Sequence, residues 1–149
     1  MNAFDLLMMD HQKVSGIFDR LEMNDGGVAG SRAELFRQLK NELDVHAHVE
    51  ETIFYPALKE AEETRELIAE AYNEHAAVKD LLAEMEATAP GEGGWDDLLA
   101  ELRENVEHHV EEEEGDLFEQ ARLVLTSEQA EALGARMERE KQRRMTATA

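Results

Sequence analysis

Two histidine–glutamate pairs carry the clearest chemical signal in this sequence. His46 precedes Glu50 by four residues, and His109 precedes Glu113 by four. Residues four apart lie one turn apart on the same face of a helix, so each pair would point an imidazole nitrogen and a carboxylate in one direction. A single pair of this kind is typical of a solvated helix surface. Its repetition favours a shared site between helices.

Each half of the chain has one more histidine on an apolar helical stripe. His11 follows Met8 on the first stripe, and His75 follows Tyr72 on the third. Taken alone, such a histidine is more often a hydrogen-bonded core residue than a ligand. His11 and His75 are 64 residues apart, however, and the two histidine–glutamate pairs are 63 apart, so all of them follow one repeat.

This set of inward polar residues predicts a two-metal site. An unpaired carboxylate in an apolar core costs several kcal/mol or more, and no lysine or arginine lies on the inward positions to neutralise it. Imidazole and carboxylate without thiolate suit iron or manganese, with zinc or cobalt as possible substitutes, and the spacing does not choose among them. The six candidate ligands are His11, His46, Glu50, His75, His109 and Glu113.

The apolar pattern predicts an all-α, up-down-up-down four-helix bundle built as a duplicated helical hairpin. Apolar residues recur in steps of three and four along four segments, and Pro56 is expected to kink the second of them. The breaker segments NDGGVAG from Asn24 and TAPGEGG from Thr88 separate the two helices of each hairpin. The stripes run over Phe4–Leu21, Leu35–Ala57, Leu67–Met85 and Leu98–Leu117.

Capping signatures mark two further helix starts. Ser31 with Glu34 predicts the start of the second helix, and Thr126 with Gln129 predicts a short fifth helix near the C-terminus. We therefore divide the chain into the bundle, 1–125, and a C-terminal helix with a basic tail, 126–149. The tail contains the basic stretch RMEREKQRRM, which is typical of a solvated helix end, and we predict no function for it.

Composition limits the class of protein. The 149 residues fit one domain, and the absence of cysteine excludes disulfides, iron–sulfur clusters and thiolate zinc sites. A formal net charge of -20 disfavours nucleic acid as a partner. No apolar run suggests a membrane span and no basic start suggests a signal peptide, so we expect a cytoplasmic protein.

The segments HAHVEETIFYPAL and HHVEEEEGDLF resemble the two motif segments of the hemerythrin-like family, in its bacterial branch. The resemblance implies a di-iron centre in which His11, His46, His75 and His109 are terminal ligands. It also implies that Glu50 and Glu113 bridge the two irons. The oxygen carriers of the family have a histidine where this chain has Lys79, and an aspartate where it has Glu113, so reversible oxygen carriage is not implied.

Several residues near the motifs are expected to lie outside the set of six ligands. His48 and His108 are expected at the surface, although His48 with Glu51 offers an alternative register. Glu51 or Glu114 could orient a ligand histidine from outside the ligand set. The aromatic residues Tyr55 and Tyr72 lie near the motifs and could bond to a metal-bound species, but packing is the favoured interpretation.

Three functions remain open from the sequence. The first is a non-haem di-iron protein that binds or reacts with oxygen, peroxide or nitric oxide, in sensing, detoxification or stress response. The second is a non-catalytic iron-binding or iron-sensing module, and the third is a helical interaction protein without metal. Whether the chain is an enzyme stays open, and no inward basic group favours phosphoester hydrolysis.

Overall fold

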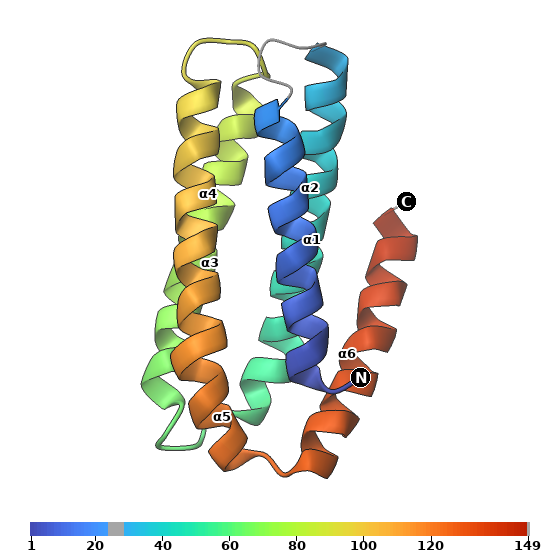
Figure 1. Ribbon diagram of the computed structural model, residues 1–149, viewed down its shortest axis with the longest axis vertical. Helices are drawn as coiled ribbons and strands as arrows, with labels where there is room; N and C mark the ends of the chain where they lie inside the picture. The colour runs from blue at the N-terminus through green and yellow to red at the C-terminus, as the bar shows by residue number, and fades with distance from the viewer. Residues whose placement is uncertain (24–28, 149) are drawn as a thin grey trace.

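The computed structural model describes residues 1–23 and 29–148, and all regular secondary structure within these ranges is helical (Figure 1). The first four long helices stand side by side as a bundle, as the sequence predicts. No described helix is long and apolar enough to pass through a membrane. The α-helices are α1 (Ala3–Met23), α2 (Ala29–Val49), α3 (Arg65–Ala87), α4 (Trp95–Glu112), α5 (Phe118–Val124) and α6 (Ser127–Thr148). The remaining helical turns are η1 (Glu50–Phe54), η2 (Tyr55–Ala57) and η3 (Glu113–Leu117).

Of the two helix starts predicted from capping signatures, the structure confirms the one at Thr126 and contradicts the one at Ser31. The Thr126 and Gln129 side chains each accept a hydrogen bond from the other residue's backbone N–H, at 3.1 and 2.8 Å, which confirms the predicted capping box of α6. The capping role predicted for Ser31 is wrong, because α2 begins at Ala29 and Ser31 lies inside it. The breaker residues 24–28 lie outside the described residues.

The helix predicted as a short fifth one is α6, and it is longer than the sequence suggested. α6 extends over 22 residues and lies along the side of the bundle beside α1 and α2 (Figure 1). The extended backbone of Leu125 separates it from α5. The division of the chain at residue 125 stays a prediction.

Both motif helices change their winding at the candidate glutamates. η1 and η3 are π-helical turns that begin at Glu50 and Glu113, where the sequence suggested continuous α-helix. Pro56 lies in the 3₁₀ turn η2, which ends the second helix, so the proline terminates this helix near its predicted end instead of kinking it. Single π-turns inside helices are frequent at functional sites.

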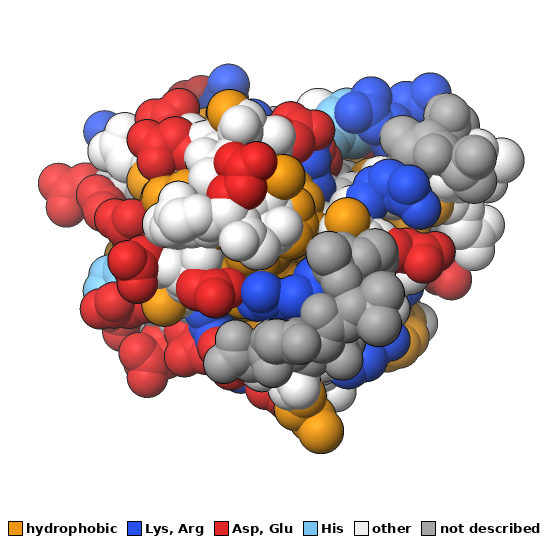
Figure 2. Space-filling view, turned by 90° about the horizontal axis from the view of Figure 1, so that it is seen from above, with side chains coloured by type: hydrophobic (Ala, Val, Ile, Leu, Met, Phe, Trp, Pro, Cys, Tyr) orange, Lys and Arg blue, Asp and Glu red, His pale blue; other side chains and the backbone are white. Residues whose placement is uncertain are grey.

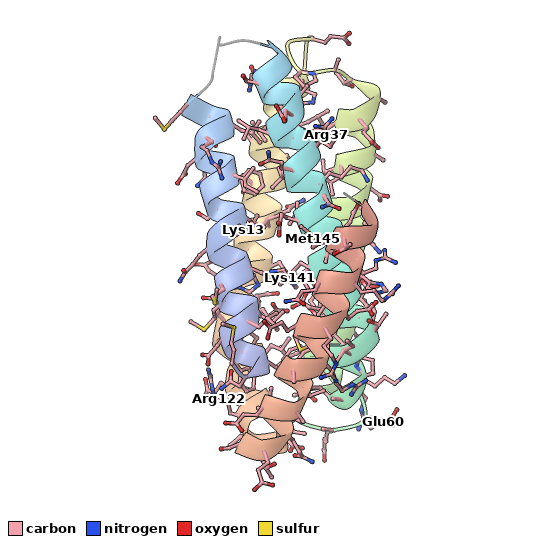
Figure 3. The ribbon with its side chains drawn as sticks, turned by 90° about the vertical axis from the view of Figure 1, so that its right-hand side faces the viewer. Lys13, Arg37, Glu60, Arg122, Lys141 and Met145 are labelled. Atoms are coloured by element: carbon pink, nitrogen blue, oxygen red, sulfur yellow. The ribbon has the colours of Figure 1, made fainter. Side chains whose placement is uncertain are left out.

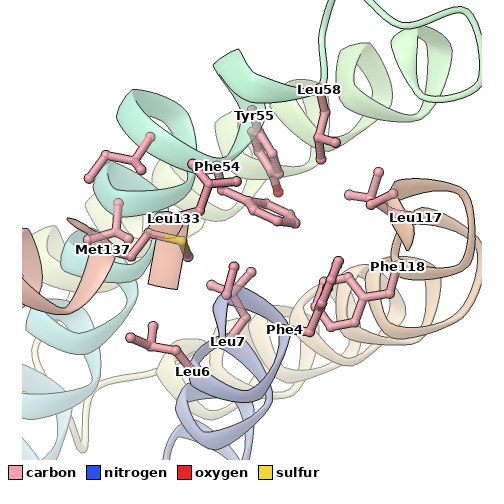
Figure 4. Close-up of a cluster of buried hydrophobic side chains, with 14 of the residues drawn as sticks. Phe4, Leu6, Leu7, Phe54, Tyr55, Leu58, Leu117, Phe118, Leu133 and Met137 are labelled. Atoms are coloured by element: carbon pink, nitrogen blue, oxygen red, sulfur yellow. The ribbon is translucent and has the colours of Figure 1, made fainter. Parts of the chain in front are cut away.

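Two apolar clusters fill the bundle, one on each side of the candidate ligands. The first contains Phe4, Phe54 and Phe118, whose rings meet edge to face with centroids 5.0 to 6.1 Å apart (Figure 4). The second surrounds Phe18 and Trp95 at the other end. The buried histidines lie between the clusters, since His11 stands between apolar residues of the first and of the second on α1.

Charge is unevenly distributed over the surface. Acidic side chains cover the side of α3 and α4, whereas Lys and Arg side chains gather over α6 (Figure 2). The basic residues of α6 lie in the segment RMEREKQRR, from Arg136 to Arg144. The C-terminal helix is therefore the most cationic part of a strongly acidic chain.

The docking of α6 depends on a glycine. A Cβ built on Gly134 would lie 2.7 Å from Asn2 C and 2.9 Å from Ala3 N, and it would also overlap Met1 O. The start of the chain therefore packs directly on the α6 backbone, beside the buried Leu133 and Met137.

We predict that Gly134→Ala lowers the free energy of unfolding by about 1–3 kcal/mol, because the new methyl group forces the chain start away from α6. Chemical denaturation of the metal-free protein measures this. Gly16→Ala is the matched control, since Gly16 lies inside α1 with nothing within 4 Å of a built Cβ. That substitution should raise stability by up to about 1 kcal/mol through helix propensity. Equal effects of the two changes would contradict the role given to Gly134.

Candidate metal centre

The structure brings all six predicted ligand residues together in the middle of the bundle. They come from six elements, α1, α2, η1, α3, α4 and η3, and all of their side chains are buried. Glu50 and Glu113 are the deepest, at 0% and 1% exposure. The sequence-based expectation that two carboxylates occupy the apolar interior agrees with this placement.

The two carboxylates lie between two pairs of histidines. Glu50 Oε1 is 3.2 Å from His46 Nε2, 3.0 Å from His75 Nε2 and 3.8 Å from His109 Nε2. Glu113 contacts both pairs as well, with Oε1 3.1 Å from His11 Nε2 and Oε2 3.5 Å from His109 Nε2. The donor atoms fall into two groups, each within 4.8 Å: His11, His46, Glu50 and Glu113, and then Glu50, His75 and His109.

Five buried side-chain atoms that could bind a metal have no hydrogen-bond partner among the described residues. They are close enough to one another for electrostatic contact but are not aligned as donor and acceptor. Because an unsatisfied buried polar atom costs about 1–3 kcal/mol, five at one place call for a cation. The residues therefore fit a metal site on their own geometry. These atoms are the Nε2 atoms of His11, His46 and His109, with Glu50 Oε2 and Glu113 Oε1.

The Nδ1 atom of each of the four inward histidines is hydrogen-bonded to a carboxylate. In each case Nδ1–H can donate to the carboxylate, which leaves the Nε2 lone pair directed at the centre and makes the imidazole a better ligand. The bonds join His11 to Glu114 at 2.6 Å, His46 to Asp10 at 3.0 Å, His75 to Glu51 at 2.6 Å and His109 to Glu74 at 2.6 Å.

These outer carboxylates follow the same repeat as the ligands. Asp10 and Glu74 are 64 residues apart, and Glu51 and Glu114 are 63 apart. The expectation that Glu51 and Glu114 contact ligand histidines agrees with the structure. Asp10 and Glu74 were not among the predicted residues, although an acidic residue directly before the histidine in the first helix of each hairpin was a visible signal.

Tyr55 also takes part in the centre, and the interpretation of its ring as packing alone is wrong. Its hydroxyl donates to Glu113 Oε2 at 2.6 Å and lies 3.0 Å from Glu50 Oε1. The ring packs in the first apolar cluster (Figure 4), and because its hydroxyl contacts Glu50 and Glu113, the residue joins that cluster to both carboxylates. Tyr72 is half-exposed and stacks edge to face on Tyr55, at 5.5 Å between ring centroids.

The remaining sequence candidates lie outside the ligand set. His108 is on the surface, as expected. His48 is half-buried, and its Nε2 lies 2.6 Å from Glu140 on α6, so the alternative register of His48 with Glu51 is not what the structure shows. The Lys79 ammonium is turned toward Glu51, at 3.8 Å from its carboxylate.

An apolar cavity of about 40 Å³ lies beside the four histidines. A space of this size accommodates a few water-sized molecules or one diatomic molecule. Asp44 and Lys79 are the charged residues in its lining. Its apolar side chains include Val14, Leu43, Val78, Leu82, Val106 and Val110.

The carboxylates raise the pKa values of two histidines when no metal is bound. Burial lowers the pKa of His46, but attraction to Glu50 and the hydrogen bond to Asp10 outweigh it and raise the pKa to about 10. Burial likewise lowers the pKa of His109, and contacts with Glu113, Glu50 and Glu74 raise it to about 12. Without metal, protons on His46 and His109 thus offset part of the charge of the buried carboxylates.

Helical bundles that gather histidine and carboxylate side chains at their centre form a class of metal-binding proteins, and this chain has the fold and the donor set of that class. A family model, the hemerythrin HHE cation binding domain, matches residues 2–121. The chain therefore belongs to the hemerythrin HHE family.

Relatives of known sequence and structure support this assignment. The crystal structure of a hemerythrin HHE cation binding domain-containing protein from Mycobacterium kansasii superposes with a TM-score of 0.84 at 31% identity, covering 99% of this chain and 90% of that one. An uncharacterized Mycobacterium tuberculosis protein is 30% identical over 92% of this chain and 83% of its own length. A DNA nickase of Nostoc is 34% identical over 88% of this chain, which spans only 36% of that relative.

We predict that the metal-free protein loses stability as the pH rises above neutral. Because the pKa values of His46 and His109 in the folded protein lie above the ordinary histidine value of about 6.5, the stabilisation by their protonated forms is complete below that pH and is lost as the pH rises through about 10 and about 12. Urea unfolding at several pH values measures the slope. His46→Gln should make it shallower, and His108→Gln on the surface should not. An equal slope in all three proteins would refute the assignment.

Tyr55→Phe should lower the stability of the metal-free protein by about 1–3 kcal/mol, because two buried carboxylates lose a donor. Tyr72→Phe is the matched control. Its hydroxyl only approaches the Glu51 carbonyl, at 3.4 Å, so its effect should stay within about 0.5 kcal/mol. Denaturant unfolding of both variants tests the difference. An unchanged stability of Tyr55→Phe would contradict the role given to Tyr55 in the centre.

Proposed function

We propose that this chain is a non-haem di-iron protein that binds or reacts with oxygen, peroxide or nitric oxide. In this proposal the two carboxylates are shared between two iron ions. The observation that carries it is the set of five buried nitrogen and carboxylate oxygen atoms that have no hydrogen-bond partner among the described residues and lie between the helices, in two groups that share Glu50. The proposed ligands are His11, His46, Glu50, His75, His109 and Glu113.

The donor arrangement favours two metals over one. The two donor groups have Glu50 in common, and Glu113 also approaches a histidine of each pair. A single metal placed in either group would leave the two histidines of the other group without a metal. Iron is favoured by the resemblance to the hemerythrin-like family, while a donor set of nitrogen and oxygen also suits manganese and zinc.

The surroundings of the centre favour a small, weakly polar ligand. Bound iron would supply electron exchange with such a ligand, while the protein determines what reaches it. The apolar cavity beside the histidines has room for a diatomic molecule or peroxide. With Lys79 turned to Glu51, fewer imidazoles face the centre than in an oxygen carrier, and this leaves more coordination positions for an exogenous ligand.

The DNA-nicking activity named for the Nostoc relative is not proposed for this chain. The shared region is about a third of that protein. The net charge of -20 also opposes contact with a phosphate backbone.

Anaerobic titration with Fe²⁺ should load two ions per chain and raise the melting temperature, since ligand at 100 times its dissociation constant adds about 2.7 kcal/mol. Elemental analysis after desalting gives the ratio. Glu113→Gln should weaken binding about tenfold or more, because it removes a shared carboxylate. Glu111→Gln, an exposed residue two positions earlier, serves as the matched control.

Reactivity then separates the functions. Adding oxygen, hydrogen peroxide or nitric oxide to the loaded protein should change its near-ultraviolet absorption. Iron uptake without any such change would favour the iron-binding or iron-sensing module. Failure to bind iron, manganese or zinc would leave a helical interaction protein.

A further inference from the structure

The C-terminal helix contacts the candidate metal centre through one buried carboxylate. Lys141 on α6 donates from Nζ to Asp10 Oδ1, and Asp10 Oδ2 accepts the bond from His46 Nδ1 at 3.0 Å. Figure 3 shows Lys141 on the side of α6 that lies along α1. A continuous path of hydrogen bonds thus runs from α6 through α1 to a proposed ligand on α2.

Asp10 differs from the other three outer carboxylates in its surroundings. Its side chain is only 4% exposed, against 35% for Glu114, 23% for Glu51 and 13% for Glu74. Glu51 has Lys79 nearby, but at 3.8 Å that ammonium is beyond hydrogen-bond distance. Water can solvate the other three carboxylates in part, whereas Asp10 depends on a cation from α6.

The charge of Lys141 has a direct physical role at this depth. A carboxylate removed from water needs compensating charge and hydrogen bonds, or the structure moves to expose it. With Lys141 in place, Asp10 is held on both oxygens and fixes the ring of His46. Without it, Asp10 would be drawn toward solvent, and His46 would lose the partner that orients its Nε2.

We propose that Lys141 and Asp10 form a positioning pair through which α6 controls metal retention at one of the two metal positions, the one that contains His11 and His46. This inference rests on the proposed ligand set. The pair touches neither the reacting molecule nor the metal, and it acts through His46. The position with His75 and His109 takes its support from Glu51 and Glu74 instead.

Coupling of this kind works in both directions. If docked α6 improves metal binding, then bound metal must hold α6 more firmly by the same free energy. A second contact supports this docking, since Glu140 binds His48 Nε2 at 2.6 Å and also Arg143 at 2.6 Å. α6 is therefore placed to report whether the centre is loaded.

Stepwise titration of the metal-free protein with Co²⁺, followed by its visible absorption, tests the proposal. Lys141→Met should weaken one of the two binding steps about tenfold, and Asp10→Asn should weaken the same step by about 10–100-fold. Lys141→Arg should restore it, because it keeps the cation. In a protein that already carries His46→Gln, Lys141→Met should have no further effect on metal binding. In a protein that carries His109→Gln, Lys141→Met should weaken binding as it does in the wild type.

Lys13→Met is the matched control. It also removes one lysine from a buried carboxylate, Glu42 at 2.7 Å, and it changes the net charge equally, but no proposed ligand is attached to that carboxylate. Both binding steps should keep their affinities. Circular dichroism confirms that each variant is folded before titration.

Hydrogen exchange provides a readout independent of affinity. Adding Co²⁺ should slow amide exchange in 130–145 of the wild-type protein, and this protection should be lost in Lys141→Met. Equal titrations for Lys141→Met and Lys13→Met, or unchanged exchange in α6, would overturn the inference while leaving the metal centre intact. If the wild-type protein takes up no metal at all, both proposals fall together.

Discussion

The burial of two carboxylates at the centre of the bundle is the constraint on which the rest of the structure depends. Each ionised carboxylate would cost several kcal/mol in an apolar interior if it stood alone. The chain surrounds Glu50 and Glu113 with four imidazoles and one phenol, and it then gives each imidazole a carboxylate of its own. Every polar group in this arrangement is required by another one, so the centre works as a unit.

This unit also ties the helices together. Each outer carboxylate lies on a different element from the histidine that it holds, so the bonds cross from α1 to α2, from α3 to α4, from η1 to α3 and from η3 to α1. The equivalent bonds of the two halves match, which gives the site the symmetry of the duplicated hairpin. Apolar clusters on both sides keep water from the middle, and this strengthens each electrostatic contact there.

The sequence was sufficient for the fold class and for the set of six candidate ligands, because apolar periodicity and a repeated histidine spacing are local signals. It was insufficient for Tyr55 and Lys141, whose roles depend on which helices lie next to each other. Tyr55 looked like core packing because its ring is core, and only the position of its hydroxyl shows otherwise. Lys141 belongs to a basic stretch that resembles any solvated helix end until α6 is placed against α1.

The π-turns at Glu50 and Glu113 make the length of each motif segment as important as its composition. A π-turn contains one residue more than a regular α-helical turn. In a regular α-helix, residues five apart, such as Glu50 and Tyr55, would lie about 140° apart around the axis. The wider turn at η1 brings these two residues toward one face, where the Tyr55 hydroxyl reaches the Glu50 carboxylate. The extra residue of η1 is thus what lets one short segment supply both a buried carboxylate and the phenol that binds it.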